Sequence, residues 1–377
     1  MTAGKQILEL PTGREQLRDE TVAFALEVIE SCGLVARLES ECTSATGRRR
    51  GLGVKALLVG LFLLSIEDRP LHLKAVAELL WWRLSDEARE LLGICSRAGT
   101  TTELRARYRC VRYLFHKILK KRDPSGLKKN RRLNKAELDA QSRTLEPEEQ
   151  ARRREALESL CNELIECSLS LVRKDEWAAW NGAVGLDATP VPLWSRGPSR
   201  RAGLEASDPD GGWYVREGDH RGEEDQKGRV RGKVAWALEA ELATMAPPAG
   251  NPAAHPNLVL GMLLERPGID PGGSGARLLC SVAARGHKAG LLGADRAYSS
   301  AHASSFHLPA RALGYLPVFD YRIDELGIQA NSNGAILVEG SWYCPAMPVD
   351  LIKATIDHRR KVLTITETST ATLVLVK

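Results

Sequence analysis

Two stretches decide the fold: AVGLDATPVPLW at residues 183–194 and LLGADRAYSS at residues 291–300. Each begins as an apolar run of strand length, and each carries one aspartate, Asp187 in the first and Asp295 in the second. A carboxylate in an apolar strand is costly to bury unless it is paired, hydrogen-bonded or bound to a metal. Taken singly, each aspartate is better explained as a turn former or helix cap, and Asp295 could cap the helix after it. If the two strands are neighbours in one sheet, however, both carboxylates lie at the same edge.

Two or three carboxylates at one edge have a specific chemical use. They can hold two divalent ions about 4 Å apart, the geometry that activates a water and stabilises a leaving alkoxide in phosphodiester chemistry. Hard oxygen ligands select Mg²⁺ or Mn²⁺ over Zn²⁺. Asp187 and Asp295 are therefore the candidate catalytic and metal-binding residues.

The pattern around these stretches predicts an α/β core with the order β-β-β-α-β-α-β. The expected strands are residues 184–189, 233–244, 257–265, 291–294 and 316–321, and the expected helices are residues 275–285 and 299–313. A long loop is predicted at 194–231. Further β segments are expected at 335–338, 342–344, 361–366 and 372–376.

The first 175 residues read instead as helices joined by tight turns. The expected helices are residues 22–33, 51–66, 72–83, 86–92, 102–121 and 147–173. Ser85 and Thr102 are the expected N-caps of two of them, and residues 128–146 are a polar connector. The fold class is thus α+β and multidomain. Residues 1–146 form a helical domain, 147–180 a connecting helix, 181–321 the core, and 322–377 an incomplete β-rich insertion.

The net charge of +5 conceals a strong asymmetry. Residues 105–135 hold thirteen basic side chains against the single acid Asp123, so this stretch carries +12 and the rest of the chain −7. Such a field attracts phosphate, although a solvated helix face with a basic loop remains the alternative. No sharp helix-turn-helix pattern names a recognition helix. The expected DNA contacts are Arg112, Lys117, Lys120, Lys121, Arg122, Lys128, Lys129, Arg131 and Arg132.

Composition excludes several other classes of protein. The chain is 43% hydrophobic and 27% charged, which is ordinary for a globular protein. Its longest apolar run, residues 56–66, is shorter than the roughly 20 residues that span a bilayer. No export signal pattern begins the chain. The eight cysteines form no C-x-x-C pair, so neither a zinc site nor a disulfide scaffold is expected, and reduced thiols in a cytoplasmic protein are the prediction.

The sequence resembles insertion-sequence transposases of the DDE superfamily over residues 180–350. The residues that carry the resemblance are GLDAT at 185–189 and DRAYS at 295–299, with DPDGGWY at 208–214, GKV at 232–234 and WYCP at 342–345. The resemblance implies an RNase H-like catalytic core in which Asp187 and Asp295 hold Mg²⁺ or Mn²⁺. It also implies double-stranded DNA partners, namely transposon ends and target, a homodimer when active, and a nucleoid-associated protein in the cytoplasm. Arg296 and Tyr298 would lie near the DNA, with local packing as the equal alternative.

The resemblance also requires a third carboxylate, a Glu on a helix after the fifth strand. The acids available are Glu325, Glu339 and Glu367, and Glu325 is the weak candidate, thirty residues past Asp295. None precedes a long helix, so we expect a chain truncated before its catalytic Glu and poor in cleavage. Two alternatives to an active transposase remain. One is a catalytically inactive, transposase-derived DNA-binding protein; the other is a helical interaction protein with an unrelated α/β domain.

Overall fold

The helices of the first half pack around the apolar helix α3. The computed structural model describes residues 16–43, 51–94, 98–126, 132–142, 146–206, 208–216, 233–248, 250–319 and 325–360. The first helices are α1 (Asp19–Glu30), α2 (Leu34–Cys42), α3 (Val54–Ile66), α4 (Leu73–Glu78), α5 (Asp86–Leu91) and α6 (Thr101–Leu119). A π-helical turn, Leu79–Arg83, continues α4. Because α3 is apolar on nearly every side, its neighbours can cover it all round, and most of its residues are buried.

Three features of this half differ from the sequence prediction. Gly33 has a left-handed backbone (φ 73°) and begins a further helix, α2, instead of only ending α1. The cap of α6 is Thr100, whose hydroxyl accepts from the Glu103 amide at 3.2 Å, and not Thr102. The expected connector contains a helix, α7 (Lys135–Ser142). The cap at Ser85 is confirmed, since its hydroxyl accepts from the Ala88 amide at 2.9 Å.

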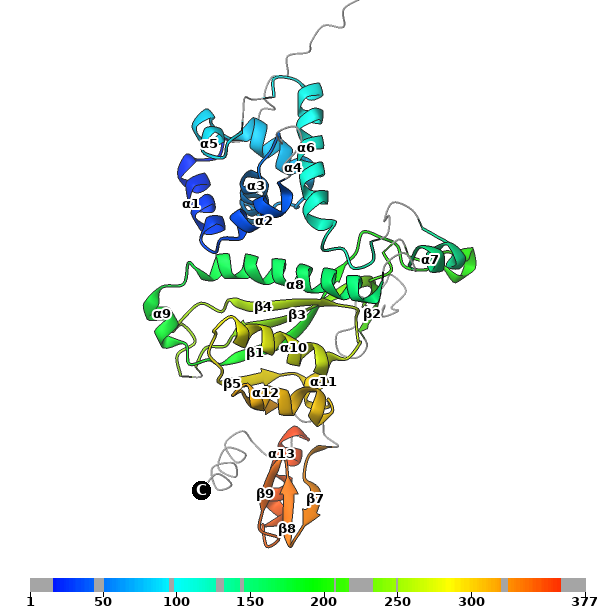
Figure 1. Cartoon of the computed structure of the whole chain (residues 1–377). Helices are drawn as coiled ribbons and strands as arrows, with labels where there is room; N and C mark the ends of the chain where they lie inside the picture. Colours follow the sequence, from blue (N-terminus) through cyan, green and yellow to red (C-terminus); the bar gives the residue numbers. More distant parts are fainter. Residues whose placement is uncertain are drawn as a thin grey trace, which may run out of the picture.

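Below the helices lies a mixed six-stranded sheet (Figure 1). Its strands are β1 (Val184–Pro192), β2 (Gly212–Arg216), β3 (Lys233–Met245), β4 (Val259–Glu265), β5 (Leu291–Ala294) and β6 (Leu316–Phe319). The strands β1, β5 and β6 run parallel, whereas β3 is antiparallel to β1, β2 and β4. The long strand β3 pairs with β1 along one edge and with β2 and then β4 along the other. The predicted five core strands are confirmed, and β2 is an addition inside the expected loop.

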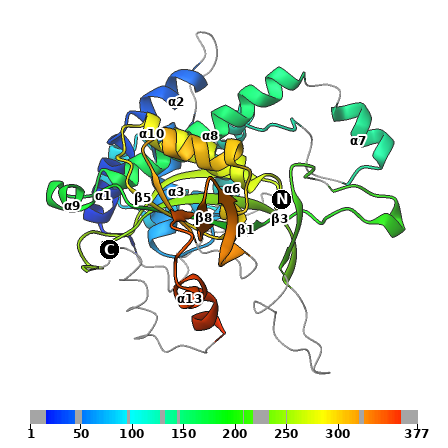
Figure 2. The same cartoon turned by 90° about the horizontal axis from the view of Figure 1, so that it is seen from below.

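The helix that links the two halves is α8 (Pro147–Leu169), followed by α9 (Lys174–Ala179). It lies beside α10 (Pro271–Ala284) on one face of the sheet (Figure 2). Arg277 of α10 pairs with Glu158 of α8 at 2.9 Å and with Glu265 of β4 at 2.7 Å. The side-chain amide of Asn162 bonds to the main-chain N–H and C=O of Met262 at 2.9 and 3.1 Å, so α8 also covers the outer edge of β4.

The single helix predicted at 299–313 is interrupted. The structure has α11 (Arg296–Ser299), a π-helical turn Ala303–His307 and α12 (Leu308–Ala312). The interruption lets Tyr298 and Phe306 both reach the buried face of the sheet, where their ring centroids are 5.4 Å apart.

A small three-stranded sheet and one helix follow the core. They are β7 (Ile328–Ser332), β8 (Ala335–Val338), β9 (Ser341–Tyr343) and α13 (Val349–Arg359). The strands predicted at 335–338 and 342–344 are confirmed, while β7 and α13 were not predicted. The segments expected at 361–366 and 372–376 lie outside the described residues, as does Glu367.

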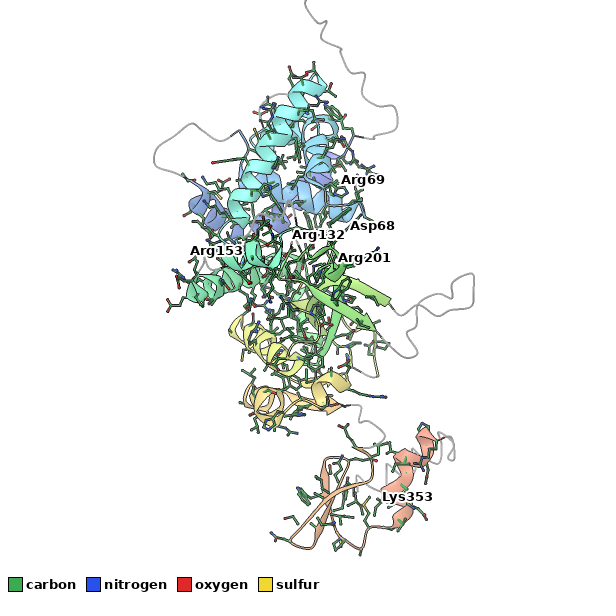
Figure 3. The ribbon with its side chains drawn as sticks, turned by 90° about the vertical axis from the view of Figure 1, so that its right-hand side faces the viewer. Asp68, Arg69, Arg132, Arg153, Arg201 and Lys353 are labelled. Atoms are coloured by element: carbon green, nitrogen blue, oxygen red, sulfur yellow. A yellow bond between two sulfur atoms is a disulfide. The ribbon has the colours of Figure 1, made fainter. Side chains whose placement is uncertain are left out.

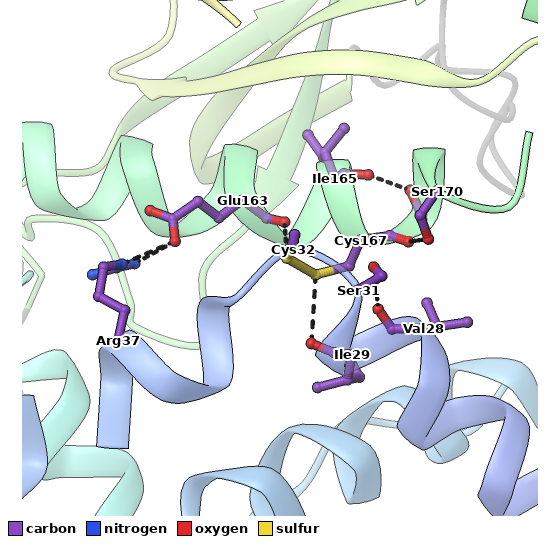
Figure 4. Close-up of a disulfide and its surroundings, with 10 residues drawn as sticks. Val28, Ile29, Ser31, Cys32, Arg37, Glu163, Ile165, Cys167 and Ser170 are labelled. Carbon is purple, nitrogen blue, oxygen red and sulfur yellow. Dashed lines mark hydrogen bonds and ion pairs between the residues drawn. A yellow bond between two sulfur atoms is a disulfide. The ribbon is translucent and has the colours of Figure 1, made fainter. Parts of the chain in front are cut away.

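Two of the cysteines are paired, contrary to the prediction of reduced thiols. Cys32, between α1 and α2, forms a disulfide with Cys167 of α8 (Figure 4). Elsewhere, none of the helices in the described ranges combines the length and the apolarity that crossing a bilayer requires.

Candidate active site and basic surface

The two aspartates lie at adjoining positions of the parallel neighbours β1 and β5. In the pairing of β1 with β5, Leu186 is opposite Ala294; Asp187 follows Leu186 within β1, and Asp295 follows Ala294 just past the end of β5. Both are exposed to solvent. The adjacency on which the sequence argument depended is therefore present.

Each aspartate is oriented by a main-chain amide. Oδ1 of Asp187 accepts from the Ala188 N–H at 2.8 Å. Oδ1 of Asp295 accepts from the Ala297 N–H at 2.9 Å, so Asp295 does cap α11, as the alternative explanation held. Capping occupies one oxygen of a carboxylate, and the cap itself fixes the side chain, so this role is compatible with a second one.

Directly behind the pair lies a buried tyrosine–glutamate contact that sequence reasoning missed. The Tyr298 hydroxyl donates to the carboxylate of Glu241 on β3, and these residues are 1% and 2% exposed. Burial raises the pKa of Glu241 to about 7; the Tyr298 bond opposes this shift, while the charges of Glu239, Glu265 and Asp295 add to it. Glu241 is the second of two alternating acids on β3, after Glu239, so it did not show the single acid in an apolar strand that singled out Asp187.

The same negative field acts on the tyrosine. Burial raises the pKa of Tyr298, and the charges of Glu241, Asp295 and Asp187 raise it further. Tyr298 thus remains a neutral hydrogen-bond donor that holds α11, and with it Asp295, against β3. Because it is buried, we remove Tyr298 from the expected DNA contacts. Arg296 is exposed on α11, next to Asp295.

Within the described ranges, no third carboxylate joins the pair. Among the residues that the structure describes, no three His, Cys, Asp or Glu side chains are grouped so as to hold one ion. Glu325 begins the segment after the described core, and its main-chain carbonyl is bonded by the Gln329 side chain. Glu339 is in the turn between β8 and β9, where its carboxylate accepts from Thr355 at 3.0 Å. Glu241 is too buried to share a solvent-exposed ion.

The basic stretch lies on α6 and the turn after it. Helical spacing places a cationic stripe on one face of the helix, and all of its members are exposed: Arg105, Arg109, Arg112, His116 and Lys120. The opposite face, including Leu104, Val111 and Ile118, is buried in the helical core. Residues of this surface line a shallow groove of about 600 Å³, namely Arg109, Arg112, Tyr113, His116, Lys117 and Lys120.

The other expected DNA contacts differ in their placement. Lys121 is exposed, Arg132 is half-buried, and the Lys117 amine donates to the Cys42 carbonyl at 2.8 Å. Lys128, Lys129 and Arg131 lie outside the described residues.

Arg122 is a structural residue instead. It is 3% exposed, and its guanidinium bonds both oxygens of Glu41 at 2.8 and 3.0 Å. Burial acts to raise the pKa of Glu41, but Arg122 and Arg37 outweigh it and hold that pKa below its usual value. A buried guanidinium that already binds a carboxylate in this way is not available to a phosphate, so we remove Arg122 from the DNA surface.

Comparison with known proteins adds no family to this picture. No family model matches the chain, and no curated protein or solved structure is significantly similar to it.

Proposed function

We propose that this chain is a DNA transposase of the DDE type, which holds DNA on α6 and cleaves it at the Asp187–Asp295 pair. The observation that carries the proposal is that these two exposed aspartates occupy adjoining positions, Asp187 on β1 and Asp295 directly after β5. Two independent observations support it. The sequence pattern predicts that each aspartate lies on or next to a strand, and the β1–β5 pairing makes those two strands neighbours.

The sheet gives further support. An RNase H-like core is the finer description that we infer for the order β4-β3-β1-β5-β6, with β1, β5 and β6 parallel and β3 reversed. Sites of open α/β sheets lie outside the carboxyl ends of parallel strands, where loops can present polar groups without disturbing the core. Asp295 occupies such a position directly after β5, and Asp187 adjoins it on β1.

The donor set fits a hard divalent cation. Mg²⁺ is commonly bound by one or two protein carboxylates together with substrate phosphates and waters, so Asp187 and Asp295 would hold it without a third acid. When bound, such an ion supplies charge stabilisation at a phosphoryl oxygen and a more acidic water. The chain's own part is orientation: Ala188 and Ala297 fix the two carboxylates, and the Tyr298–Glu241 contact fixes the turn that carries Asp295.

The test is divalent-metal-dependent nicking of DNA that carries the terminal inverted repeats of an element, using the full chain. Asp187→Asn and Asp295→Asn should each lower the rate about 10²- to 10³-fold, because each removes a charge placed at the reacting phosphate. Asp350→Asn, on exposed α13, is the matched control and should cleave normally. Equal rates in all three variants would place the chemistry elsewhere. A loss with Glu325→Gln would add Glu325 to the site.

A second candidate function is DNA binding without cleavage. It is favoured by one observation, that no group of three metal-ligating side chains is found in the described part of the chain. Both candidates require the α6 surface, so the binding experiment is common to them and the nicking experiment separates them.

The DNA surface is tested by the salt dependence of binding to duplex DNA. The logarithm of affinity should fall linearly with the logarithm of salt concentration, and each phosphate contact contributes about 0.9 to the slope. Arg109→Ala, Arg112→Ala and Lys120→Ala should each reduce the slope by about that amount. Lys353→Ala, an exposed cation of α13 (Figure 3), is the control and should leave it unchanged. Identical slopes throughout would rule out α6 as the DNA surface.

A further inference from the structure

Trp194 is the most exposed large side chain of the core. It follows β1 directly and is 93% exposed, although tryptophan is usually among the more buried residues of a fold. A ring contact with His72, just before α4, has centroids 5.7 Å apart and an edge-on geometry. Most of the indole surface is therefore open to solvent.

The backbone that carries Trp194 is held by a hydrogen bond and by close packing. The Leu193 amide bonds to the Trp236 carbonyl at 2.9 Å, which continues the β1–β3 pairing past the end of β1. At Gly197 even a methyl group would lie 2.6 Å from the Trp213 ring and 2.9 Å from the Trp236 ring. The segment 193–197 therefore packs closely against the rings of Trp213 and Trp236, whose centroids are 5.4 Å apart. The backbone that carries the exposed Trp194 ring is held in place by this packing.

The surroundings of this ring carry positive charge. Arg196 and Arg201 belong to the same loop and are exposed, and neither is paired with an acid in the part of the chain that the structure describes. Figure 3 shows Arg201 on the same flank as Arg69, whose guanidinium is paired with Glu67 at 3.6 Å, so the unpaired charge here is that of Arg196 and Arg201. Proteins that bind single-stranded nucleic acid combine these two features. An aromatic ring stacks on a base, and a nearby guanidinium group binds a phosphate.

We propose that Trp194 stacks on an unpaired nucleobase of DNA bound to the core, with Arg196 at the adjoining phosphate. The proposal rests on the function proposed above, because Asp187 lies on β1 and Trp194 lies just beyond the end of that strand. Trp194 is seven residues past Asp187, and the first five of these belong to β1, so the two are about 23 Å apart if the chain stays extended at 3.3 Å per residue. Stacked nucleotides rise about 3.4 Å each along one strand. A strand that follows β1 would place the stacked base about seven nucleotides from the cleaved phosphate.

The test measures binding alone, so that it does not depend on cleavage. The full chain carrying Asp187→Asn and Asp295→Asn is titrated, in EDTA, into fluorescein-labelled (dT)20, a 20-base-pair duplex, and a fork with 10-nucleotide unpaired arms. Adding Trp194→Ala should weaken binding to the single strand and the fork about 5- to 150-fold, the range for one stacked base. Duplex affinity should change less than twofold, and Trp194→Phe should retain most of the binding.

Two controls separate stacking from a structural effect. Trp342→Ala, on β9, removes another exposed indole and should leave binding to all three probes unchanged. The thermal midpoint of Trp194→Ala should equal that of its parent, because the ring buries almost no surface. Arg196→Ala should weaken single-strand and duplex binding by similar factors, as expected for a phosphate contact.

A fluorescent base locates the contact. With 2-aminopurine moved along the fork arm, quenching should peak about seven nucleotides from the junction and disappear in Trp194→Ala. The stacking proposal is overturned if Trp194→Ala weakens duplex and single-strand binding equally, if it weakens neither, or if the parent binds none of the probes. If Trp194 stacks on a base but the chain does not nick DNA, only the catalytic assignment is refuted. If the chain nicks DNA but Trp194 does not stack, only the stacking proposal is refuted.

Discussion

At the scale of single residues, Glu241 makes the stability of the protein depend on pH. Its carboxyl group is buried and accepts from the Tyr298 hydroxyl, and burial raises its pKa to about 7. The folded chain therefore holds this proton more tightly than the unfolded chain, in which the pKa is near 4.5. The contribution is complete below about pH 4.5 and is lost as the pH rises through 7. A shift of this size corresponds to a few kcal/mol.

We expect Glu241→Gln to remove this dependence, because glutamine still accepts from Tyr298 and does not titrate. The free energy of unfolding in urea, measured at pH 5, 6, 7 and 8, should decline across that range in the natural sequence by more than in the variant. At pH 8 the variant should be the more stable protein. Asp350→Asn, which removes an exposed acid of α13, is the control and should keep the natural slope. Parallel slopes for Glu241→Gln and the natural sequence would contradict the assignment.

Residue-scale burial also decides which site residues the sequence could predict. The aspartate pair was predictable, because strand periodicity and one acid per run are local signals. The burial of Tyr298 and Arg122 was not, since each is held by an acid far along the chain, Glu241 57 residues away and Glu41 81 residues away. A local pattern shows the charge or the aromatic ring and cannot show its partner.

At the scale of elements, one side chain of α8 bonds directly to the main chain of β4. Asn162 supplies an acceptor to the Met262 amide and a donor to the Met262 carbonyl, so an otherwise open strand edge is satisfied. Asn162→Ala removes both bonds and leaves two main-chain groups covered by α8 without partners. We expect it to lower the free energy of unfolding by about 1–3 kcal/mol.

Urea unfolding of Asn162→Ala measures this loss. Ser168→Ala is the control on the same helix, because the Ser168 hydroxyl bonds only within its own turn, to the Ile165 carbonyl at 2.7 Å. It should cost a few tenths of a kcal/mol at most. If the free energy of unfolding falls equally in the two variants, the Asn162 bonds to β4 do not contribute to stability.

The core strands were predicted well, whereas α2, α7, β7 and α13 were missed and the helix expected at 299–313 is interrupted. The strands β1, β3, β4, β5 and β6 appear where alternation or apolar runs placed them. The helix α7 was missed because its residues are polar, although its start carries a signal. Asn134 and Glu137 cap one another's amides at 2.9 and 3.0 Å, the reciprocal pattern of a capping box. Attention to capping as well as to periodicity would have found it.

At the scale of the whole molecule, α8 is fastened to the helical half as well as to the sheet. Cys32 is bonded to Cys167 of α8, and one turn earlier the Arg37 guanidinium grips Glu163 at 2.7 and 3.0 Å (Figure 4). On its other side α8 meets α10 through Glu166, whose carboxylate pairs with Arg285 and lies 2.8 Å from the His287 ring. The helix α8 thus connects the sheet to the helical half, which includes α6.

We expect the disulfide to stabilise this connection by restricting the unfolded chain. It closes a loop with a sequence separation of 135 residues, for which chain entropy predicts a gain of about 2–5 kcal/mol. Cys32→Ser with Cys167→Ser should lower the thermal midpoint, and a dithiol reductant should lower that of the natural sequence to the same value. Cys280→Ser, at an exposed free thiol, should change neither.

The Arg37–Glu163 pair decides how the reduced protein behaves. Because it joins the same two segments without covalent chemistry, the reduced chain should keep α8 docked, and duplex DNA binding should change less than threefold on reduction. Arg37→Ala alone should have a small effect in the oxidised chain, since the disulfide still closes the contact. In the reduced protein, Arg37→Ala should lower both duplex DNA binding and stability, because the disulfide and the Arg37–Glu163 pair are then both absent. If Arg37→Ala has equal effects in oxidised and reduced protein, the two contacts act independently and α8 is held mainly by its apolar packing.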